Sequence, residues 1–295
     1  MMKNLIFLLG LVLVLGVSCK SGSTGSTESA ASDSDSKLTA FIEAAKEING
    51  DVASPTTVTD IFELSGAPFM PELVNDPLNF EKYKNNNVSA ALNLGVYLVD
   101  ALYLYAYDKN TEGYNSLMAA KSLAAHIGFA EIFDETLIER YEDGNYPDSV
   151  HYMLENVLIE TGKVLQKEER LRIYTSIVMG NYIEEMYILF SAIMEYPDKG
   201  IPEESKLLLL RELIIGLRTQ LSALPQLISL IEMHITEEDP HDLINMLKEL
   251  QEIRSSYGYT NAEIMKLTPE MIFKDELIQK MYTTVKEMRT YAVGE

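Results

Sequence analysis

One acidic residue lies inside the most apolar stretch of the chain. Asp100 is the only charged residue among residues 88–107, which are otherwise mostly apolar and aromatic. A carboxylate in a buried helix must be paired, hydrogen-bonded or protonated, because an isolated buried charge is very costly. Helical spacing places Asn93 and Tyr97 near the face of Asp100, which makes both of them local candidates for its hydrogen-bond partner. The pattern has two interpretations, a structural polar network or a ligand-facing acid in a pocket.

A second apolar stretch, residues 173–194, carries two adjacent acids, Glu184 and Glu185. Neighbouring residues on a helix point about 100° apart, so the two carboxylates cannot face the same partner. We expect one of them to pair with a cation or face water, and the other to approach Asp100 if the two helices pack. Two close carboxyl groups shift each other's pKa and can serve as acid and base, as in glycosidases. This chemistry makes a carboxylate-based hydrolase of envelope glycans or peptides an alternative function.

The two stretches share a short pattern, in which a Gly is followed by a Tyr and then by an acid at the same spacing. The matched residues are Gly95, Tyr97 and Asp100 in the first stretch and Gly180, Tyr182 and Glu185 in the second. Internal duplication explains this pattern, but so few matched residues favour convergent composition of two buried helices. The glycines are expected to let helices approach closely. The candidate binding residues are Asn93, Tyr97, Asp100, Asn181, Tyr182, Glu184 and Glu185.

Other arrangements of reactive side chains are weaker. Residues 234–242, HITEEDPHD, offer His and acid ligands for a divalent ion at a turn between helices. Asp239 as a helix N-cap, with Pro240 at the first helical position, explains this segment without a metal. The chain has no Gly-rich phosphate loop, Gly-x-Ser-x-Gly or His-Glu-x-x-His sequence. We therefore expect no catalytic residue, no metal site and no cofactor.

The chain contains 17 Tyr and no Trp, and several of the tyrosines cluster in or after the first apolar stretch. Tyr suits the walls of amphipathic pockets and interfaces. A Tyr-rich core whose hydroxyl groups reach the surface is the simpler interpretation. The clustered residues are Tyr97, Tyr103, Tyr105, Tyr107 and Tyr114.

The elements that position these side chains are predicted to be helices throughout. No window alternates polar and apolar residues for long enough to indicate a sheet. Residues 88–107 are apolar on all sides, which is typical of a central helix packed on every side. A membrane span is the rival interpretation, but Asn93, Asp100 and four Tyr would then need partners in lipid. The predicted fold is an all-α bundle of about eight main helices in a single domain, residues 37–295.

Gly, Pro and capping residues mark the expected helix ends. A loop-rich segment, residues 49–77, precedes the first long helix. Asn110 or Thr111 starts a helix that Gly128 ends, and Pro225 predicts a kink inside another helix. The predicted helices are residues 38–48, 88–107, 110–126, 135–142, 147–166, 168–196 and 202–234, one beginning near residue 240, and 269–291.

The 295 residues include 47% apolar residues and carry a formal charge of −21, which describes a globular, acidic protein. Phosphate binding needs clustered Lys and Arg, so the acidic balance argues against nucleic acid as a partner. It argues equally against an anionic membrane surface as a partner of the folded body. Solubility alone accounts for the charge.

The first residues resemble a bacterial lipoprotein signal. Lys3 precedes an apolar run, residues 5–17, that is too short to span a bilayer comfortably. The only Cys, Cys19, follows a small residue, Ser18, and an aliphatic residue, as in a lipobox, although Gly16 stands where Leu is usual. We expect cleavage after Ser18 and acylation of Cys19. An ordinary signal peptide with a stray Cys, or an uncleaved anchor, is the alternative.

Acyl chains on Cys19 would make the membrane a partner of the protein. Residues 19–36 are rich in Ser and Gly and are expected to form a flexible tether to the folded body. The acidic residues of this tether come late, whereas an acidic run directly after the Cys resembles a surface-export signal. The predicted location is the outer membrane, with the periplasmic face favoured over the cell surface.

Four segments of the chain carry a resemblance: SPTTVTDIFELSGAPF, ALNLGVYLVDALYLYAYDKN, LAAHIGFAEIFDETLIERYED and MGNYIEEMYI. Together they are similar to a family of uncharacterised all-helical lipoproteins from Bacteroidota-type bacteria, over residues 54–196. The resemblance implies export, lipid anchoring and a helical fold. It implies no catalytic residue, because no activity is established for the family. The family tends to have Gly-Gly-Trp before the second acid pair, whereas this chain has Met179, Gly180, Asn181 and Tyr182.

The sequence therefore predicts a cell-envelope lipoprotein that binds a small ligand or an envelope protein near Asp100 and Glu185. The hydrolase is the first alternative, and it requires these acids to line an open cleft. A purely structural scaffold is the second alternative. Acids that are dry and mutually paired would exclude the hydrolase on the geometry of two-carboxylate catalysis.

Overall fold

The computed structural model describes residues 61–62, 65–133, 157, 160–165, 170–195, 203–237 and 239–294. Within these ranges the chain forms helices and connecting turns without strands, so the predicted all-α class is confirmed. All of them belong to one compact unit, Leu38–Glu295. The signal, the tether, the helices predicted at 38–48 and 135–142, and most of the one at 147–166 lie outside the described residues.

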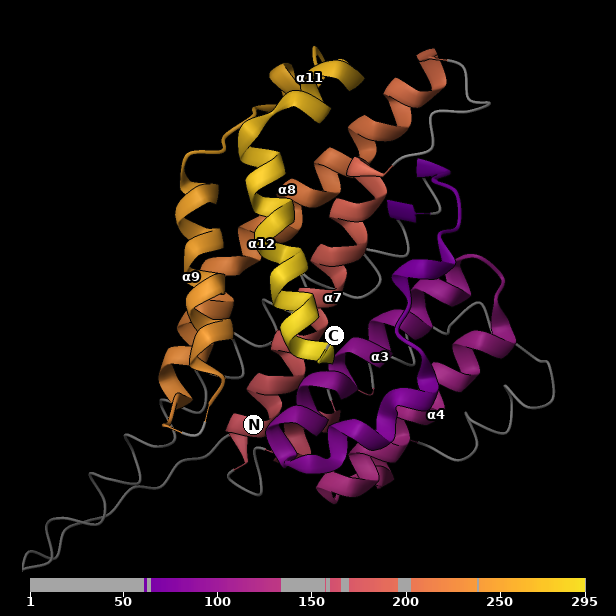
Figure 1. Ribbon diagram of the computed structural model, residues 1–295, viewed down its shortest axis with the longest axis vertical. Coiled ribbons are helices and arrows are strands. Elements are labelled where there is room, and N and C mark those ends of the chain that lie inside the picture. Colours follow the sequence, from indigo (N-terminus) through magenta and orange to yellow (C-terminus); the bar gives the residue numbers. More distant parts are fainter. Residues whose placement is uncertain are drawn as a thin grey trace, which may run out of the picture. The chain divides into compact units, whose positions relative to one another are not determined.

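The predicted central helix is α3, Asn87–Ala106 (Figure 1). The side chain of Asn86 caps its first turn by accepting the N–H of Ser89 at 2.8 Å. Its length and apolar composition would suit a membrane span, but 83% of its most apolar window is buried in the fold, as expected for a core helix. Asp108, with φ of 57°, reverses the chain directly after it. The predicted extent and burial of this helix are confirmed.

Helix α4, Asn110–Ile127, returns along α3 (Figure 1). It starts at the predicted Asn110 and ends at the predicted Gly128, which adopts a left-handed φ of 94° and donates its N–H to the carbonyls of Ala124 and Ala125. A residue with a Cβ is strained in this conformation, which is why Gly ends the helix. The 3-10 turn η4, Ala130–Ile132, follows.

Helix α7, Leu171–Met194, crosses α3 with backbone against backbone. A Cβ atom on Gly95 would lie 2.2 Å from the carbonyl oxygen of Ile177, and one on Gly180 would lie 1.9 Å from that of Leu92. No side chain fits at either position, so the two glycines set the distance between the helices. The expectation that these glycines permit close approach is confirmed.

Two long helices of the C-terminal part of the chain cover α7, and a third packs on both of them (Figure 1). Helix α8, Glu203–His234, packs on α7 and continues through Pro225. Helix α9, His241–Ser255, packs on α8 and α12, and α12, Glu276–Val293, packs on α7 and α3. The shorter elements are η2 (Pro71–Leu73), η3 (Pro77–Asn85), α10 (Asn261–Ile264) and α11 (Pro269–Lys274).

Two predicted helix starts need correction. The single last helix predicted at residues 269–291 is two helices, because the side chain of Asp275 accepts the N–H groups of Leu277 and Ile278 and caps a new helix, α12. The predicted cap by Asp239 is also wrong. Helix α9 begins at His241 without a side-chain cap, and the carboxylate of Asp239 binds Arg172 and Thr236 instead.

Candidate functional site

A stripe of five polar side chains follows one face of α3. Their spacing of three or four residues repeats the helical period, so they lie above one another. Asn93 and Asp100 are fully buried, and Tyr97 and Tyr103 are at most 1% exposed. The stripe consists of Asn93, Tyr97, Asp100, Tyr103 and Tyr107.

The middle of the stripe binds the backbone of the segment that precedes η3. The hydroxyl of Tyr97 donates to the carbonyl oxygen of Asp76 at 2.8 Å. The Oδ2 atom of Asp100 accepts the backbone N–H of Asn75 at 3.1 Å. The sequence suggested Asn93 and Tyr97 as partners of Asp100, and this is wrong: the hydrogen bonds of both residues go to backbone carbonyls.

The C-terminal part of the stripe binds the same segment further upstream. Tyr103 accepts the N–H of Met70 at 3.0 Å, and the hydroxyl of Tyr107 donates to the carbonyl oxygen of Ala67 at 2.6 Å. Non-helical backbone buried against a helix must find partners outside a ladder, and these side chains supply them. The hydroxyls of three of the five clustered tyrosines, Tyr97, Tyr103 and Tyr107, thus bind backbone groups, whereas the sequence suggested that the hydroxyls reach the surface.

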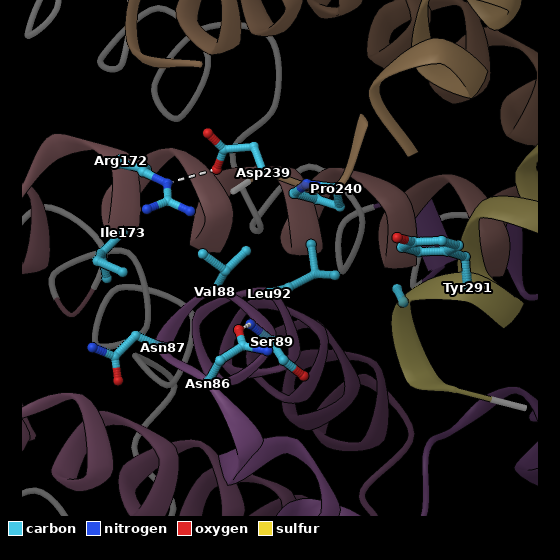
Figure 2. A pocket seen from close by; sticks show the side chains of 11 residues that line it. Asn86, Asn87, Val88, Ser89, Leu92, Arg172, Ile173, Asp239, Pro240 and Tyr291 are labelled. Carbon is cyan, nitrogen blue, oxygen red and sulfur yellow. Dashed lines mark hydrogen bonds and ion pairs between the residues drawn. The ribbon is translucent and has the colours of Figure 1, made fainter. Parts of the chain in front are cut away.

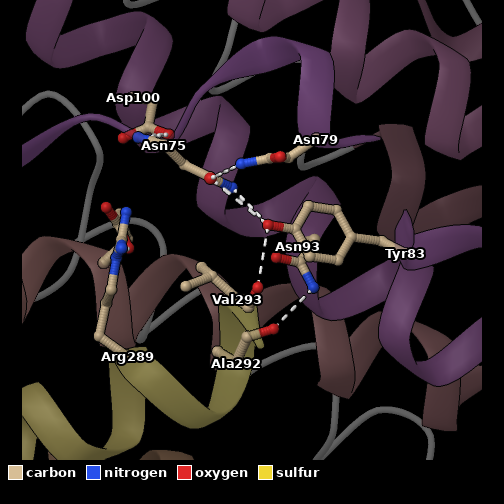
Figure 3. Close-up of polar contacts among 9 residues, drawn as sticks. Asn75, Asn79, Tyr83, Asn93, Asp100, Arg289, Ala292 and Val293 are labelled. Atoms are coloured by element: carbon tan, nitrogen blue, oxygen red, sulfur yellow. Dashed lines mark hydrogen bonds and ion pairs between the residues drawn. The ribbon is translucent and has the colours of Figure 1, made fainter. Parts of the chain in front are cut away.

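The N-terminal end of the stripe holds the end of α12 (Figure 3). The amide of Asn93 donates to the carbonyl oxygen of Ala292 at 2.9 Å, and the hydroxyl of Tyr83 donates to that of Val293 at 3.2 Å. Asn75 in turn donates its side-chain N–H to Tyr83 at 3.0 Å. The last carbonyls of a helix have no partner within it, so these two side chains replace solvent at a buried helix end.

Beside this network lies an acid triad formed by Asp100, Glu184 and Arg289, one residue each from α3, α7 and α12. The two acids have no exposed surface and Arg289 is 5% exposed. The Nε atom of Arg289 donates to Glu184 at 3.3 Å, and its guanidinium lies 4.9 Å from the ring centre of Tyr187. Glu184 approaches Asp100, as expected of one of the adjacent glutamates, but the other was expected to pair with a cation or face water, and this is wrong: Glu184 also binds Arg289, and Glu185 is 1% exposed.

The pKa of Asp100 is raised well above its ordinary value. Burial is the main cause, and the negative charge of Glu184 adds to it. Arg289 and the N–H of Asn75 act in the opposite direction, and a hydrogen bond between the carboxyl groups of Asp100 and Glu184 raises the pKa further. The acid triad therefore favours a protonated carboxyl group at its centre.

Glu185 occupies a separate environment. It is 1% exposed, and burial alone raises its pKa to about 8. Among the described residues, its Oε1 atom, the hydroxyl of Tyr182 and the Oδ1 atom of Asn181 have no hydrogen-bond partner. The positive charge of Arg254 reaches Tyr182, whose pKa burial raises above its usual range. Glu185 matches Asp100 in the sequence pattern but not in its surroundings.

The buried acids do not form the cleft that a hydrolase needs. Asp100 and Glu184 face each other in the core and have no exposed surface, so neither can reach a glycosidic or peptide bond. A general acid or base must come within hydrogen-bond reach of its substrate. All seven sequence-predicted binding residues are at most 5% exposed. The structure thus joins Asp100 to Glu184 and places the group in the core.

A groove of about 620 Å³ opens at the surface near these buried residues (Figure 2). The first turns of α3 and α7, the start of α9 and the end of α12 surround it. Arg172 donates to Asp239 at 2.7 Å on one side, and three polar residues of the start of α3 lie on the other (Figure 2). Its lining residues are Asn86, Asn87, Val88, Ser89, Leu92, Arg172, Ile173, Asp239, Pro240, Tyr291 and Ala292.

The charged pair of the groove is ionised over a wide pH range. Burial by itself would raise the pKa of Asp239, but hydrogen bonds from Arg172 and Thr236 outweigh it and hold the pKa below its usual value. The described part of residues 234–242 forms no cluster of three His, Cys or acidic side chains suitable for a metal. The sequence pointed to this segment but gave no sign that Asp239 faces Arg172, 67 residues away.

No protein-family model, curated protein or solved structure matches this chain. The resemblance to all-helical lipoproteins therefore stays a prediction, and the site must be interpreted from its own geometry.

Proposed function

We propose that this protein is a lipid-anchored component of the bacterial cell envelope whose helical body binds a small ligand or another envelope protein in the groove. The observation that carries the proposal is the groove itself. Its volume of about 620 Å³ lies within the range of roughly 300–1,000 Å³ common for ligand sites. Its lining combines exposed amides and a half-buried ion pair with apolar residues.

The groove replaces Asp100 as the candidate contact surface. Leu92 and Ala292 are buried and line the groove, while Asn87 and Tyr291 are exposed. Ala292 is also the residue whose carbonyl oxygen accepts the amide of Asn93. The stripe on α3 thus holds one wall of the groove in place without touching a ligand. In this proposal the buried polar residues support binding by keeping the wall of the groove rigid.

The anchoring part of the proposal comes from the sequence. The apolar run before Cys19 and the Ser- and Gly-rich tether after it support acylation and a flexible link to the envelope. The late acids of the tether favour the periplasmic face of the outer membrane. On a tether, the body could meet partners at the membrane while its acidic surface stays in solution.

A scaffold without a ligand is the second candidate function. The burial of every sequence-predicted binding residue favours it, because each of these residues is accounted for as part of the core. The hydrolase is not proposed, because the acid triad is closed to substrate. The two remaining functions differ in whether the groove is occupied in cells.

Site-specific photo-crosslinking in intact cells distinguishes them. A photoreactive residue replaces Asn87 in the groove, and the matched control carries it at Met271, which is 51% exposed on α11. Binding predicts a discrete adduct at position 87 and none at 271. Tyr291 is 44% exposed and forms the aromatic wall of the groove. The substitution Tyr291→Ala removes this wall and should weaken the adduct. Equal labelling at both positions, or no adduct at either, would contradict the binding proposal.

A further inference from the structure

The acid triad holds two carboxyl groups and one guanidinium in a site buried from solvent. Asp100 and Glu184 have no exposed surface, and Arg289 is nearly as buried. If both acids were ionised, the triad would carry one net negative charge in the core. One proton makes it neutral, and burial strongly favours a neutral group over a charged one.

The approach of the Asp100 and Glu184 carboxyl groups to each other also favours a proton between them. Ionised carboxylates only accept hydrogen bonds, so two of them cannot bond directly unless one is protonated. Arg289 donates to Glu184, which places the negative charge there. Asn75 donates to the Oδ2 atom of Asp100, whereas the Oδ1 atom accepts from no donor among the described residues and is the oxygen that can carry a proton toward Glu184. The geometry assigns the proton to Asp100.

We propose that Asp100 is a protonated carboxylic acid in the folded protein. The contact made by its proton, called the latch below, holds the segment before η3 and the end of α12 on the core. The proton joins Asp100 to Glu184, Glu184 binds Arg289 of α12, and Asp100 binds the backbone of Asn75. Two more contacts at the end of α12, from Asn93 and Tyr83, lie in the same network. The inference is independent of any ligand in the groove.

The charges of the surrounding groups determine how the latch responds to pH. Besides the triad, the facing titratable groups are Tyr97 of α3, Asp76 and Tyr83 of the preceding segment, and Tyr187 of α7. Burial raises the pKa of Tyr97, which keeps its hydroxyl neutral. Among the described residues, Arg289 is the cation that faces both acids. Loss of the proton leaves both acids charged against one cation, so the latch is closed at acid and neutral pH and loosens as the pH rises.

The direction of the pH effect follows from the linkage between proton binding and folding. The pKa of Asp100 is raised in the fold, so its stabilising effect is fully present below its ordinary value of 3.8 and is lost as the pH rises through the raised value. Within that window the opening equilibrium changes by about tenfold per pH unit for one proton. Helix α12 is the element that opening would release first, because its buried end is held by side chains rather than by its own helix.

Asp100→Asn is the decisive variant, because Asn resembles the protonated acid. Its Nδ2 atom can donate to Glu184 while its Oδ1 atom accepts the N–H of Asn75. Hydrogen exchange of residues 286–294 is measured by mass spectrometry from pH 6 to 9.5, with the intrinsic pH dependence of exchange subtracted. The wild type should lose protection by up to about tenfold per pH unit, and Asp100→Asn should show no such loss. Both proteins carry Glu185→Gln, which removes the other buried carboxyl group with a raised pKa, and Glu212→Gln at an exposed position of α8 is the control that should keep the dependence on pH.

A second measurement reads the proton directly. Carboxyl-¹³C-labelled Asp in the wild-type protein is followed by NMR across the same pH range. The proposal predicts one Asp carboxyl group that is protonated at pH 7 and that disappears from the spectrum of Asp100→Asn. Ionisation of every Asp at pH 7 would overturn it. An Asp100→Asn protein that fails to fold, or that opens more readily than the wild type at neutral pH, would also overturn it, since both show that the native site needs a charge.

Discussion

The burial of Glu185 has a measurable consequence for the stability of the fold. It is 1% exposed in the middle of α7, and burial raises its pKa from 4.5 to about 8. The substitution Glu185→Gln keeps the shape of the side chain and removes its ability to ionise. We predict that this variant is more stable than the wild type at alkaline pH.

The size of the effect follows from the two pKa values. Stability from a carboxyl group with a raised pKa is fully present below pH 4.5 and is lost as the pH rises toward about 8. Each pH unit in this window changes the free energy of unfolding by about 1.4 kcal/mol. The window is about 3.5 pH units wide, so ionising Glu185 costs the folded state up to about 5 kcal/mol. Small domains have only about 5–15 kcal/mol in total.

Urea unfolding at several pH values between 4.5 and 9 measures this effect. The difference in unfolding free energy between Glu185→Gln and wild type should rise with pH in favour of the variant. Taking the difference cancels the titration of Asp100 and every other shared group. Glu212→Gln makes the same chemical change at an exposed position of α8, where we expect about 0.5 kcal/mol or less.

A fall in the difference with pH would refute the reasoning. It would mean that ionised Glu185 is stabilised by a cation in the fold. Arg254 of α9 is the nearest candidate, because its charge already reaches Tyr182 on the same face of α7. A flat difference would also refute it, since the carboxyl group would then titrate alike in the folded and unfolded chain.

Two further predictions concern the helix crossing and the anchor. Gly180→Ala places a Cβ atom 1.9 Å from the carbonyl oxygen of Leu92, so it should destabilise the fold by about 3 kcal/mol or more in urea unfolding, whereas Gly258→Ala, which meets no atom within 4 Å, should change little. Cys19→Ala should abolish incorporation of labelled palmitate in cells, and retention of the label by this variant would contradict the proposed anchor.

The helices around the buried acids were predictable because their signals are local. The apolar run before Tyr107 fixes α3, and Gly128 ends α4 because only Gly adopts its left-handed φ of 94° without strain. The same reasoning placed Gly95 and Gly180 at a close approach. The extent of α3 and the end of α4 depend on neighbours within a few residues, which a sequence displays directly, whereas the glycines indicated a close approach but not which helix makes it.

The partners of Asp100 were not predictable in the same way. Helical spacing correctly put Asn93 and Tyr97 on the same face of the helix as Asp100. Side chains that share a face of a buried helix can nevertheless bind different neighbours. Each one bonded a different backbone group brought in by tertiary packing. Asn75 and Arg289 come from segments 25 and 189 residues away, and no local pattern marks them. The groove is missed for the same reason, since four helix ends form it.

The adjacent acids show where sequence reasoning stops. Glu184 and Glu185 are the same residue type on one helix, and the helical step of about 100° predicts only that their surroundings differ. Packing decides the rest: Glu184 meets Arg289 and Asp100, whereas Glu185 meets a dry interior that raises its pKa to about 8. Removing the charge of Glu184 would take this carboxylate away from the buried Arg289 and destabilise the fold. Removing the charge of Glu185 should stabilise the fold. Opposite effects of the same substitution at neighbouring positions are therefore the signature of this site.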